Sequence, residues 1–199
     1  AVAISTPAGN YETVEVITEN EGSTDTRYYA KDVGLVKSVF LVDDYTISST
    51  LSAIESDISL IQTVRFYYPN VDSETIYYAD KEIIFRTNDV TADKLAAAYK
   101  EVPGGVGKVI SENTVINSLS LGDDGIPHID FNRAFLTEMN AGSGYEAMIL
   151  SCIADTFGGY YNTNKVIVTV DGALYESGHF AFAEGETIAA DFDSAVLLP

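Results

Sequence analysis

Residues 114–172 read TVINSLSLGDDGIPHIDFNRAFLTEMNAGSGYEAMILSCIADTFGGYYNTNKVIVTVDG. Apolar and polar residues alternate on both sides of Gly122-Asp123-Asp124-Gly125, which predicts two strands joined by a tight hairpin, since Asp-Gly tolerates the positive φ of such turns. Apolar residues then recur at helical spacing over residues 149–157, and the run at 166–170 is typical of a central strand. The stretch therefore predicts a packed scaffold of strands and one helix.

The ends of these elements carry their own signals. Ser143 and Glu146 have the spacing of a capping box, so the helix is expected to begin at Ser143, and Gly158-Gly159 is expected to end it. On the first strand of the hairpin, one face is expected to hold Val115, Asn117, Leu119 and Leu121.

Upstream, residues 63–68 alternate as a strand that Pro69 is expected to stop, and residues 76–85 predict a second, irregular strand region. Thr91 is expected to cap a helix, with Val90 packed against Leu95 as a hydrophobic staple, before Pro103-Gly104-Gly105 ends it. From residue 63 the order is strand, strand, helix, strand, strand, helix, strand. This order favours an α+β fold with a mixed β-sheet and helices packed on one face.

The first part of the chain predicts a small antiparallel β-meander, with three strands in residues 11–42 and a turn at Glu21-Gly22. Residues 43–57 predict an edge strand followed by a linker. We therefore expect two domains, at residues 1–55 and 56–199. The first is either docked on the second or is the tail of a larger exported β domain.

Composition limits the classes of function. Of 199 residues, 46% are hydrophobic, so a sizeable core can form. Eleven basic residues against 30 acidic ones give a net charge of −19, which argues against nucleic acid and anionic lipid as partners. No apolar run approaches the length of a membrane span, so we expect no direct membrane insertion. Cys152 is the only cysteine, which rules out an internal disulfide and a cysteine zinc site.

The residues with chemical potential each have a plainer interpretation. Cys152 lies on the apolar face of the predicted helix, where cysteine packs as a small apolar residue. His128 shares an outward strand face with Asp130, which permits a His–carboxylate pair, but Asp130 can instead brace the turn at Asn132-Arg133. His179 has no motif nearby.

Two loops have compositions that can suit a ligand site. Asp123 and Asp124 lack the spacing of a calcium loop and fit a hairpin turn. Residues 104–108, GGVGK, follow a helix and precede a strand, which is the reverse of the order in phosphate-binding loops. We therefore predict no catalytic, cofactor-binding or metal-binding residues and no cofactor.

Four segments resemble the GerMN domain, the sporulation and spore-germination module. They are TVRFYYP at 63–69, HIDFN at 128–132, GSGYEA at 142–147 and VIVTVDG at 166–172. The resemblance implies a fold similar to ring-building motifs and a non-catalytic interaction module.

The front of the chain resembles the closing hairpin of β domains in exported lipoproteins of Gram-positive bacteria, through TPAGNY at 6–11, YYA at 28–30 and VGLVK at 33–37. Both resemblances imply an extracytoplasmic protein, at the cell surface or anchored as a lipoprotein in its full-length form.

Three functions follow as hypotheses. The first is a structural or interaction module of the bacterial cell envelope that binds an envelope protein or a cell-wall polymer. The second is an extracytoplasmic hydrolase that acts on wall material through acidic residues, which requires two converging carboxylates. The third is a small-ligand carrier with a deep apolar pocket.

Overall fold

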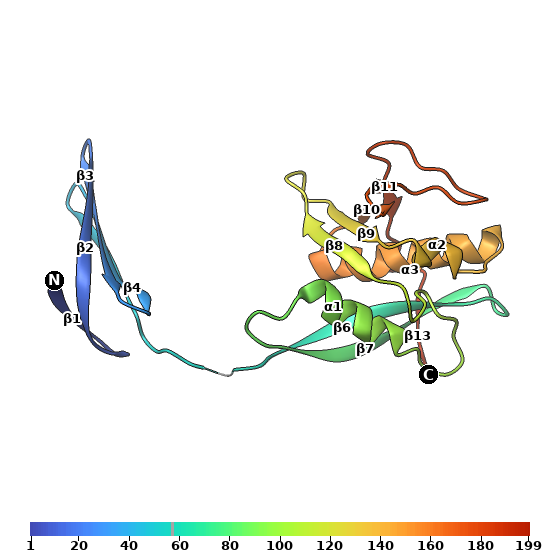
Figure 1. The fold of residues 1–199 in the computed structure, drawn as a ribbon, viewed down its shortest axis with the longest axis horizontal. Helices are drawn as coiled ribbons and strands as arrows, with labels where there is room; N and C mark the ends of the chain where they lie inside the picture. The colour runs from blue at the N-terminus through green and yellow to red at the C-terminus, as the bar shows by residue number, and fades with distance from the viewer. Residues whose placement is uncertain (57) are drawn as a thin grey trace. The chain divides into compact units, whose positions relative to one another are not determined.

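The structure is a computed structural model that describes residues 1–56 and 58–199. The chain divides into two compact units, residues 1–58 and residues 59–199 (Figure 1). The first unit is one sheet, and the second contains the helices. The proposed division into domains at residue 55 stays a prediction.

The first unit is a five-stranded antiparallel meander in chain order. It contains the three predicted strands and one more on each side, and the edge strand expected after residue 43 is present. A tight turn with Gly22 at φ 80° joins two of the strands, as predicted. The strands are β1 (Val2–Thr6), β2 (Gly9–Asn20), β3 (Ser23–Ala30), β4 (Gly34–Val42) and β5 (Tyr45–Thr50).

The second unit has two sheets and confirms the predicted α+β class. The first sheet has the order β13-β7-β6, formed by β6 (Leu60–Asn70), β7 (Thr75–Phe85) and β13 (Val196–Leu197). The second sheet has the order β11-β10-β9-β8, and β12 also pairs with β10. It is mixed, because β10 is parallel to β9 and antiparallel to β11 and β12. Its strands are β8 (Ile116–Leu121), β9 (Pro127–Phe131), β10 (Lys165–Val170), β11 (Ala173–Leu174) and β12 (Ile188–Ala189).

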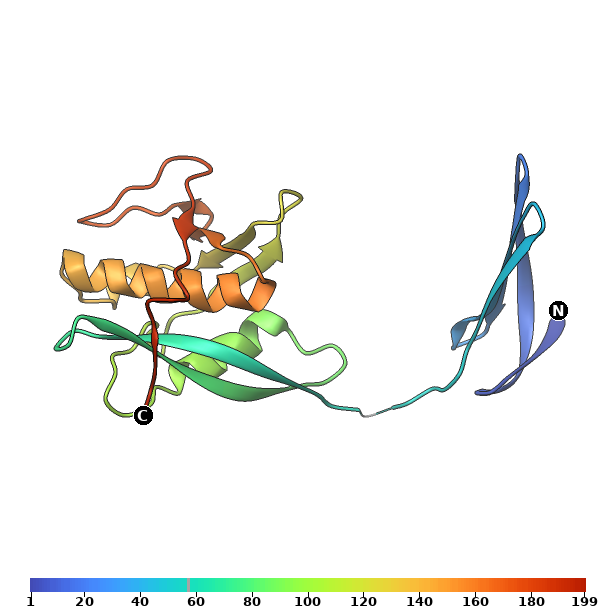
Figure 2. The same cartoon turned by 180° about the vertical axis from the view of Figure 1, so that it is seen from behind.

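Three helices pack against these sheets: α1 (Thr91–Lys100), α2 (Ala134–Thr137) and α3 (Ser143–Tyr161). The longest, α3, contacts β6 on one side and β9, β10 and β12 on the other, so it lies between the two sheets (Figures 1 and 2). No helix in residues 1–56 and 58–199 combines the length and apolar character needed to cross a membrane.

The core of the second unit is rich in aromatic side chains. The Phe66 and Tyr99 rings lie 5.1 Å apart, and the Phe131 and Phe135 rings stack at 4.3 Å. The buried Tyr99 hydroxyl lies 2.8 Å from the carbonyl oxygen of Tyr67, which ties α1 to β6. Buried aromatic groups with a satisfied polar end are a strong source of both burial and specificity.

The β8 strand corrects the predicted face assignment. A β-bulge between Ile116 and Ser118 shifts the register, so Ile116, in place of Val115, shares a face with Leu119 and Leu121. Ile116 is buried and Val115 is exposed. An extra residue in one strand reverses the side-chain alternation beyond it, and the sequence pattern alone did not reveal that residue.

The first hairpin of the second unit also differs from expectation. β6 continues through Pro69 to Asn70, and β7 is one continuous strand. Pro69 is tolerated because β6 is an edge strand and its missing N–H faces away from β7.

The helix ends correct four further predictions. The N-cap of α1 is Val90, which is exposed and makes no side-chain cap bond, so neither the Thr91 cap nor the staple forms. The N-cap of α3 is Gly142, again without a side-chain bond, so the capping box is absent. Finally, α3 runs past its two glycines to Tyr161, and Asn162 ends it in the left-handed conformation at φ 55°.

Candidate functional site

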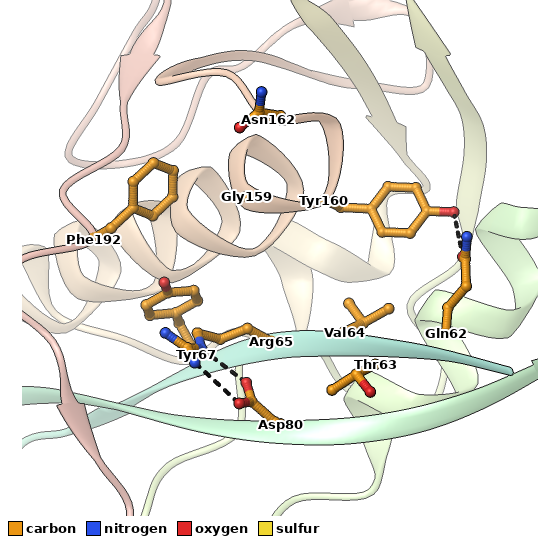
Figure 3. A pocket seen from close by; sticks show the side chains of 10 residues that line it. All are labelled: Gln62, Thr63, Val64, Arg65, Tyr67, Asp80, Gly159, Tyr160, Asn162 and Phe192. Carbon is orange, nitrogen blue, oxygen red and sulfur yellow. Dashed lines mark hydrogen bonds and ion pairs between the residues drawn. The ribbon is translucent and has the colours of Figure 1, made fainter.

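A groove of about 780 Å³ runs along β6 in the second unit (Figure 3). β6 forms one wall, and the C-terminal end of α3 forms the other. The segment after β12 closes one end with Phe192. The groove is lined by Gln62, Thr63, Val64, Arg65, Tyr67, Asp80, Gly159, Tyr160, Asn162 and Phe192.

The charges in the groove are paired. Arg65 donates two hydrogen bonds to Asp80, of 2.8 and 3.0 Å, and its guanidinium lies 3.9 Å from the centre of the Tyr78 ring. The hydrogen bond from Arg65 lowers the pKa of Asp80 below its ordinary value, and the same bond raises the pKa of Arg65. The pair therefore stays ionised with compensated charge, and a planar fork held on a ring has little freedom.

Aromatic side chains stand at both ends of the groove. The Tyr160 hydroxyl donates to Gln62 Oε1 at 3.3 Å, and the Phe192 ring lies 6.3 Å from the ring of Tyr67. Apolar surface with a few fixed polar groups is typical of binding sites.

Neighbouring groups form hydrogen bonds with part of the β6 backbone on the side away from β7. Tyr67 N–H donates to the Thr156 hydroxyl at 3.1 Å, and the Tyr67 carbonyl accepts from Tyr99. Two residues further along β6, the carbonyl of Pro69 accepts a hydrogen bond of 2.6 Å from Gly107 N–H. These contacts cover the C-terminal half of the strand's free edge.

A second polar cluster joins α3 to the segment after β11. Glu146 is buried, and its carboxylate accepts from the Tyr175 hydroxyl at 2.6 Å and lies 2.7 Å from His179 Nδ1. Burial raises the pKa of Glu146, but hydrogen bonds from Ser177, Tyr175 and His179 outweigh it and lower the pKa overall. Sequence reasoning missed this cluster. The one available signal was an acidic residue on the apolar face of the helix, three positions before Ile149.

One buried acid lacks a full set of partners. Asp155 Oδ1 accepts from Asp191 N–H at 2.7 Å, while Oδ2 has no hydrogen-bond partner among the described residues. Burial raises the pKa of Asp155 to about 6. It is not among the groove residues.

The candidates singled out in the sequence serve packing or bracing in the structure. Cys152 is fully buried, and burial raises the pKa of its thiol well above the ordinary value, which opposes reactivity. Asp130 accepts from Thr169, Gly172 and Asn117, so it braces the turn at Asp171-Gly172 and not the predicted turn at Asn132-Arg133.

The remaining candidates are dispersed. His128 is exposed, and the structure records no hydrogen bond between it and Asp130. Asp124 accepts from Ile126 N–H within the predicted hairpin turn. The 104–108 loop uses the carbonyl of Gly105 to accept from Asn70. In the described ranges, no group of three or more His, Cys, Asp or Glu side chains is placed to hold a metal ion.

Comparison with known proteins gives a family match. The sequence profile of the Germane family, described as "Sporulation and spore germination", matches residues 65–176. No curated protein matches the chain.

The solved structures that resemble it include the following three. Tandem GerMN domains of the sporulation protein GerM from Bacillus subtilis share 14% identity at a TM-score of 0.47, covering 63% of this chain and 45% of that one, so the match spans less than half of the tandem structure. A candidate lipoprotein from Clostridium perfringens shares 19% identity at a TM-score of 0.42, covering 69% and 93%. The first GerMN domain of GerM shares 16% identity at a TM-score of 0.42, covering 62% and 94%.

The matched residues 65–176 make up more than half of the chain and include most of the groove and the whole of α3. This protein therefore belongs to the Germane family of sporulation and spore germination.

Proposed function

We propose that the second unit is a non-catalytic binding module of the bacterial cell envelope, related to sporulation or germination, that holds an envelope protein or a cell-wall polymer in the groove along β6. The supporting observation is the groove itself, which combines aromatic ends with a fixed, charge-compensated Arg65–Asp80 pair. Such a pair orients a ligand without offering a proton or a free nucleophile.

The state of the buried acids favours binding over hydrolysis. A sugar hydrolase needs an accessible carboxyl group with a raised pKa facing a second carboxylate. Glu146 has a lowered pKa, and Asp155, whose pKa is raised, is only 1% exposed. The family description, sporulation and spore germination, supports the proposed extracytoplasmic location, with anchoring as a lipoprotein in the full-length form.

The test measures whether the chain binds cell-envelope material without breaking it down. The full chain is incubated with purified peptidoglycan and separately with immobilised envelope extract, and both bound protein and released soluble fragments are measured. We expect retention on one of these materials, and no fragments. Arg65→Ala is expected to weaken retention several-fold, while Arg86→Ala, at an exposed position just after β7, is expected to leave it unchanged. Release of soluble fragments by the wild type would show that the chain is an enzyme.

A further inference from the structure

We propose that the occupant of the groove is an extended, neutral or basic peptide segment of a partner protein, which joins β6 as an additional strand. This inference rests on the proposed function and names the class of ligand for the same groove. In this mode, backbone hydrogen bonds supply much of the affinity, and pockets for alternate side chains supply the specificity.

The backbone groups of β6 point alternately toward β7 and away from it. In an antiparallel ladder, alternate residues direct both N–H and C=O toward the partner strand or away from it. Tyr67 and Pro69 use their backbone groups on the side away from β7, as their bonds to Thr156 and Gly107 show. The same alternation directs Ile61, Thr63 and Arg65 to that side.

These three residues form an open edge. Their outward N–H and C=O groups have no hydrogen-bond partner among the described residues, and β6 pairs with β7 alone. Unpaired strand edges are templates for another strand, and proteins normally close them. Here the closing groups cover the edge at Tyr67 and Pro69 and leave it open at Thr63 and Arg65, which also line the groove.

The groove has the length that a short strand needs. At about 3.3 Å per residue, the edge from Ile61 to Arg65 spans about 13 Å, enough for a strand of about five residues. Thr63 and Arg65 line the groove along this edge, and Gly159 opposite them has no side chain to fill it. Tyr160 and Phe192 at the two ends offer apolar surface to the peptide's side chains.

Charge selects the kind of peptide. Residues 59–199 contain 20 acidic and eight basic side chains, a net charge of −12, and the Arg65 charge is already paired with Asp80. An acidic peptide is therefore repelled, and a second copy of this chain, with its own charge of −19, is repelled as well. A glycan could stack on the aromatic rings, but it would leave the row of backbone groups unused.

The chain itself supplies the design of the test. Thr63→Pro removes one outward N–H from the open edge, and Pro69 shows that proline is accepted on this side of β6 without loss of the β6–β7 ladder. Thr63→Ala is the matched control, because it removes the same exposed side chain and keeps the N–H. Both variants are first checked for an unchanged circular dichroism spectrum.

The probe is a nine-residue peptide selected against the full chain from a random displayed library, and its affinity is measured by calorimetry. We expect selected peptides that are neutral or basic, and binding to Thr63→Pro that is weaker than binding to Thr63→Ala by about ten-fold or more, because the two variants differ in the backbone N–H. Amide exchange at Thr63 and Arg65 should slow in the complex, which gives a readout that does not depend on the proline variant. Equal binding to Thr63→Pro with no protection of these amides, or a library that yields no binder, would overturn the inference.

The alternative ligands of the groove, a glycan and a second copy of this chain, are tested separately. Peptide-free glycan strands that bind equally to all three proteins would overturn the peptide inference while leaving the binding module intact. The peptide inference would also be overturned if light scattering showed that the wild type is a dimer and that Thr63→Pro makes it a monomer. Fragment release from peptidoglycan would instead contradict the proposed function itself.

Discussion

Glu146 is held in place by side chains more than 25 residues later in the sequence. The Tyr175 ring is fully buried and lies 5.1 Å from the ring of Phe182, so its hydroxyl reaches the carboxylate from inside the core. We expect Tyr175→Phe to lower the free energy of unfolding by about 1–3 kcal/mol, because it leaves a buried carboxylate oxygen without its donor. Urea denaturation at pH 7 measures this loss. Tyr77→Phe, at a hydroxyl for which the structure records no hydrogen bond, should change stability far less, and equal losses would contradict the role given to the buried bond.

Asp155 predicts an unusual dependence of stability on pH. Its folded pKa, about 6, lies above the value of an unfolded aspartate, so the unfolded chain binds fewer protons between these values. The stabilising contribution of Asp155 to the free energy of unfolding is therefore fully present below about pH 4 and is lost as the pH rises through about 6. Asn at this position keeps an acceptor for Asp191 N–H and cannot ionise.

We expect the stability of Asp155→Asn relative to the wild type to rise between pH 4 and pH 7.5, by at most about 3 kcal/mol. Chemical denaturation at several pH values gives the difference, and Asp193→Asn, an exposed change of the same charge, is the control. A difference that stays constant over this range would show that the buried carboxyl does not carry the effect.

Alanine substitutions at the two glycines near the end of α3 are predicted to have different effects on stability. A methyl group on Gly158 would lie 2.8 Å from the carbonyl oxygen of Thr163, while one on Gly159 would meet the Phe192 ring at an ordinary 3.6 Å. Gly158→Ala should therefore destabilise the protein, by about 1–3 kcal/mol as for other overpacked sites. Gly159→Ala should be neutral or stabilise by up to about 1 kcal/mol through its helix propensity. Thermal melts of the two variants provide the comparison, and a tolerated Gly158→Ala would contradict the close approach seen here.

The elements themselves were largely predictable, and their ends were not. Alternation and helical spacing located β6, β8, β9, β10, α1 and α3, because these patterns reflect burial on a face. The predictions of helix caps and of the strand face at the β-bulge failed for a different reason. Ser143 and Glu146 have the right spacing for a capping box, yet Glu146 gains more from Tyr175 and His179, which are distant in sequence.

The groove was beyond sequence reasoning because it depends on what covers β6. The alternation around residue 64 predicts the strand, but only the placement of Thr156 and Gly107 reveals which half of its edge is closed. The Arg65–Asp80 pair likewise depends on the cross-strand register. The family resemblance, by contrast, rested on local segments and was confirmed.

The two units are expected to differ in their ability to fold alone. In the described part of the first unit, the buried side chains are those of Thr13, Ala30 and Val36, while Tyr45 is 74% exposed. A single sheet with so little burial is marginal, whereas the second unit has an extensive aromatic core. Residues 59–199 expressed alone should melt cooperatively, and residues 1–58 should not. Circular dichroism tests both, and a sharp transition for residues 1–58 would contradict this expectation.

The last residues of the chain complete the first sheet of the second unit, since β13 lies parallel to β7 and Leu198 N–H donates to the carbonyl of Tyr78. Val196 pairs with Tyr77 across about 120 residues of sequence, and pairings between such distant segments form slowly. β13 is therefore expected to join the sheet late in folding, and until it does the outer edge of β7 is exposed to unwanted association with other chains.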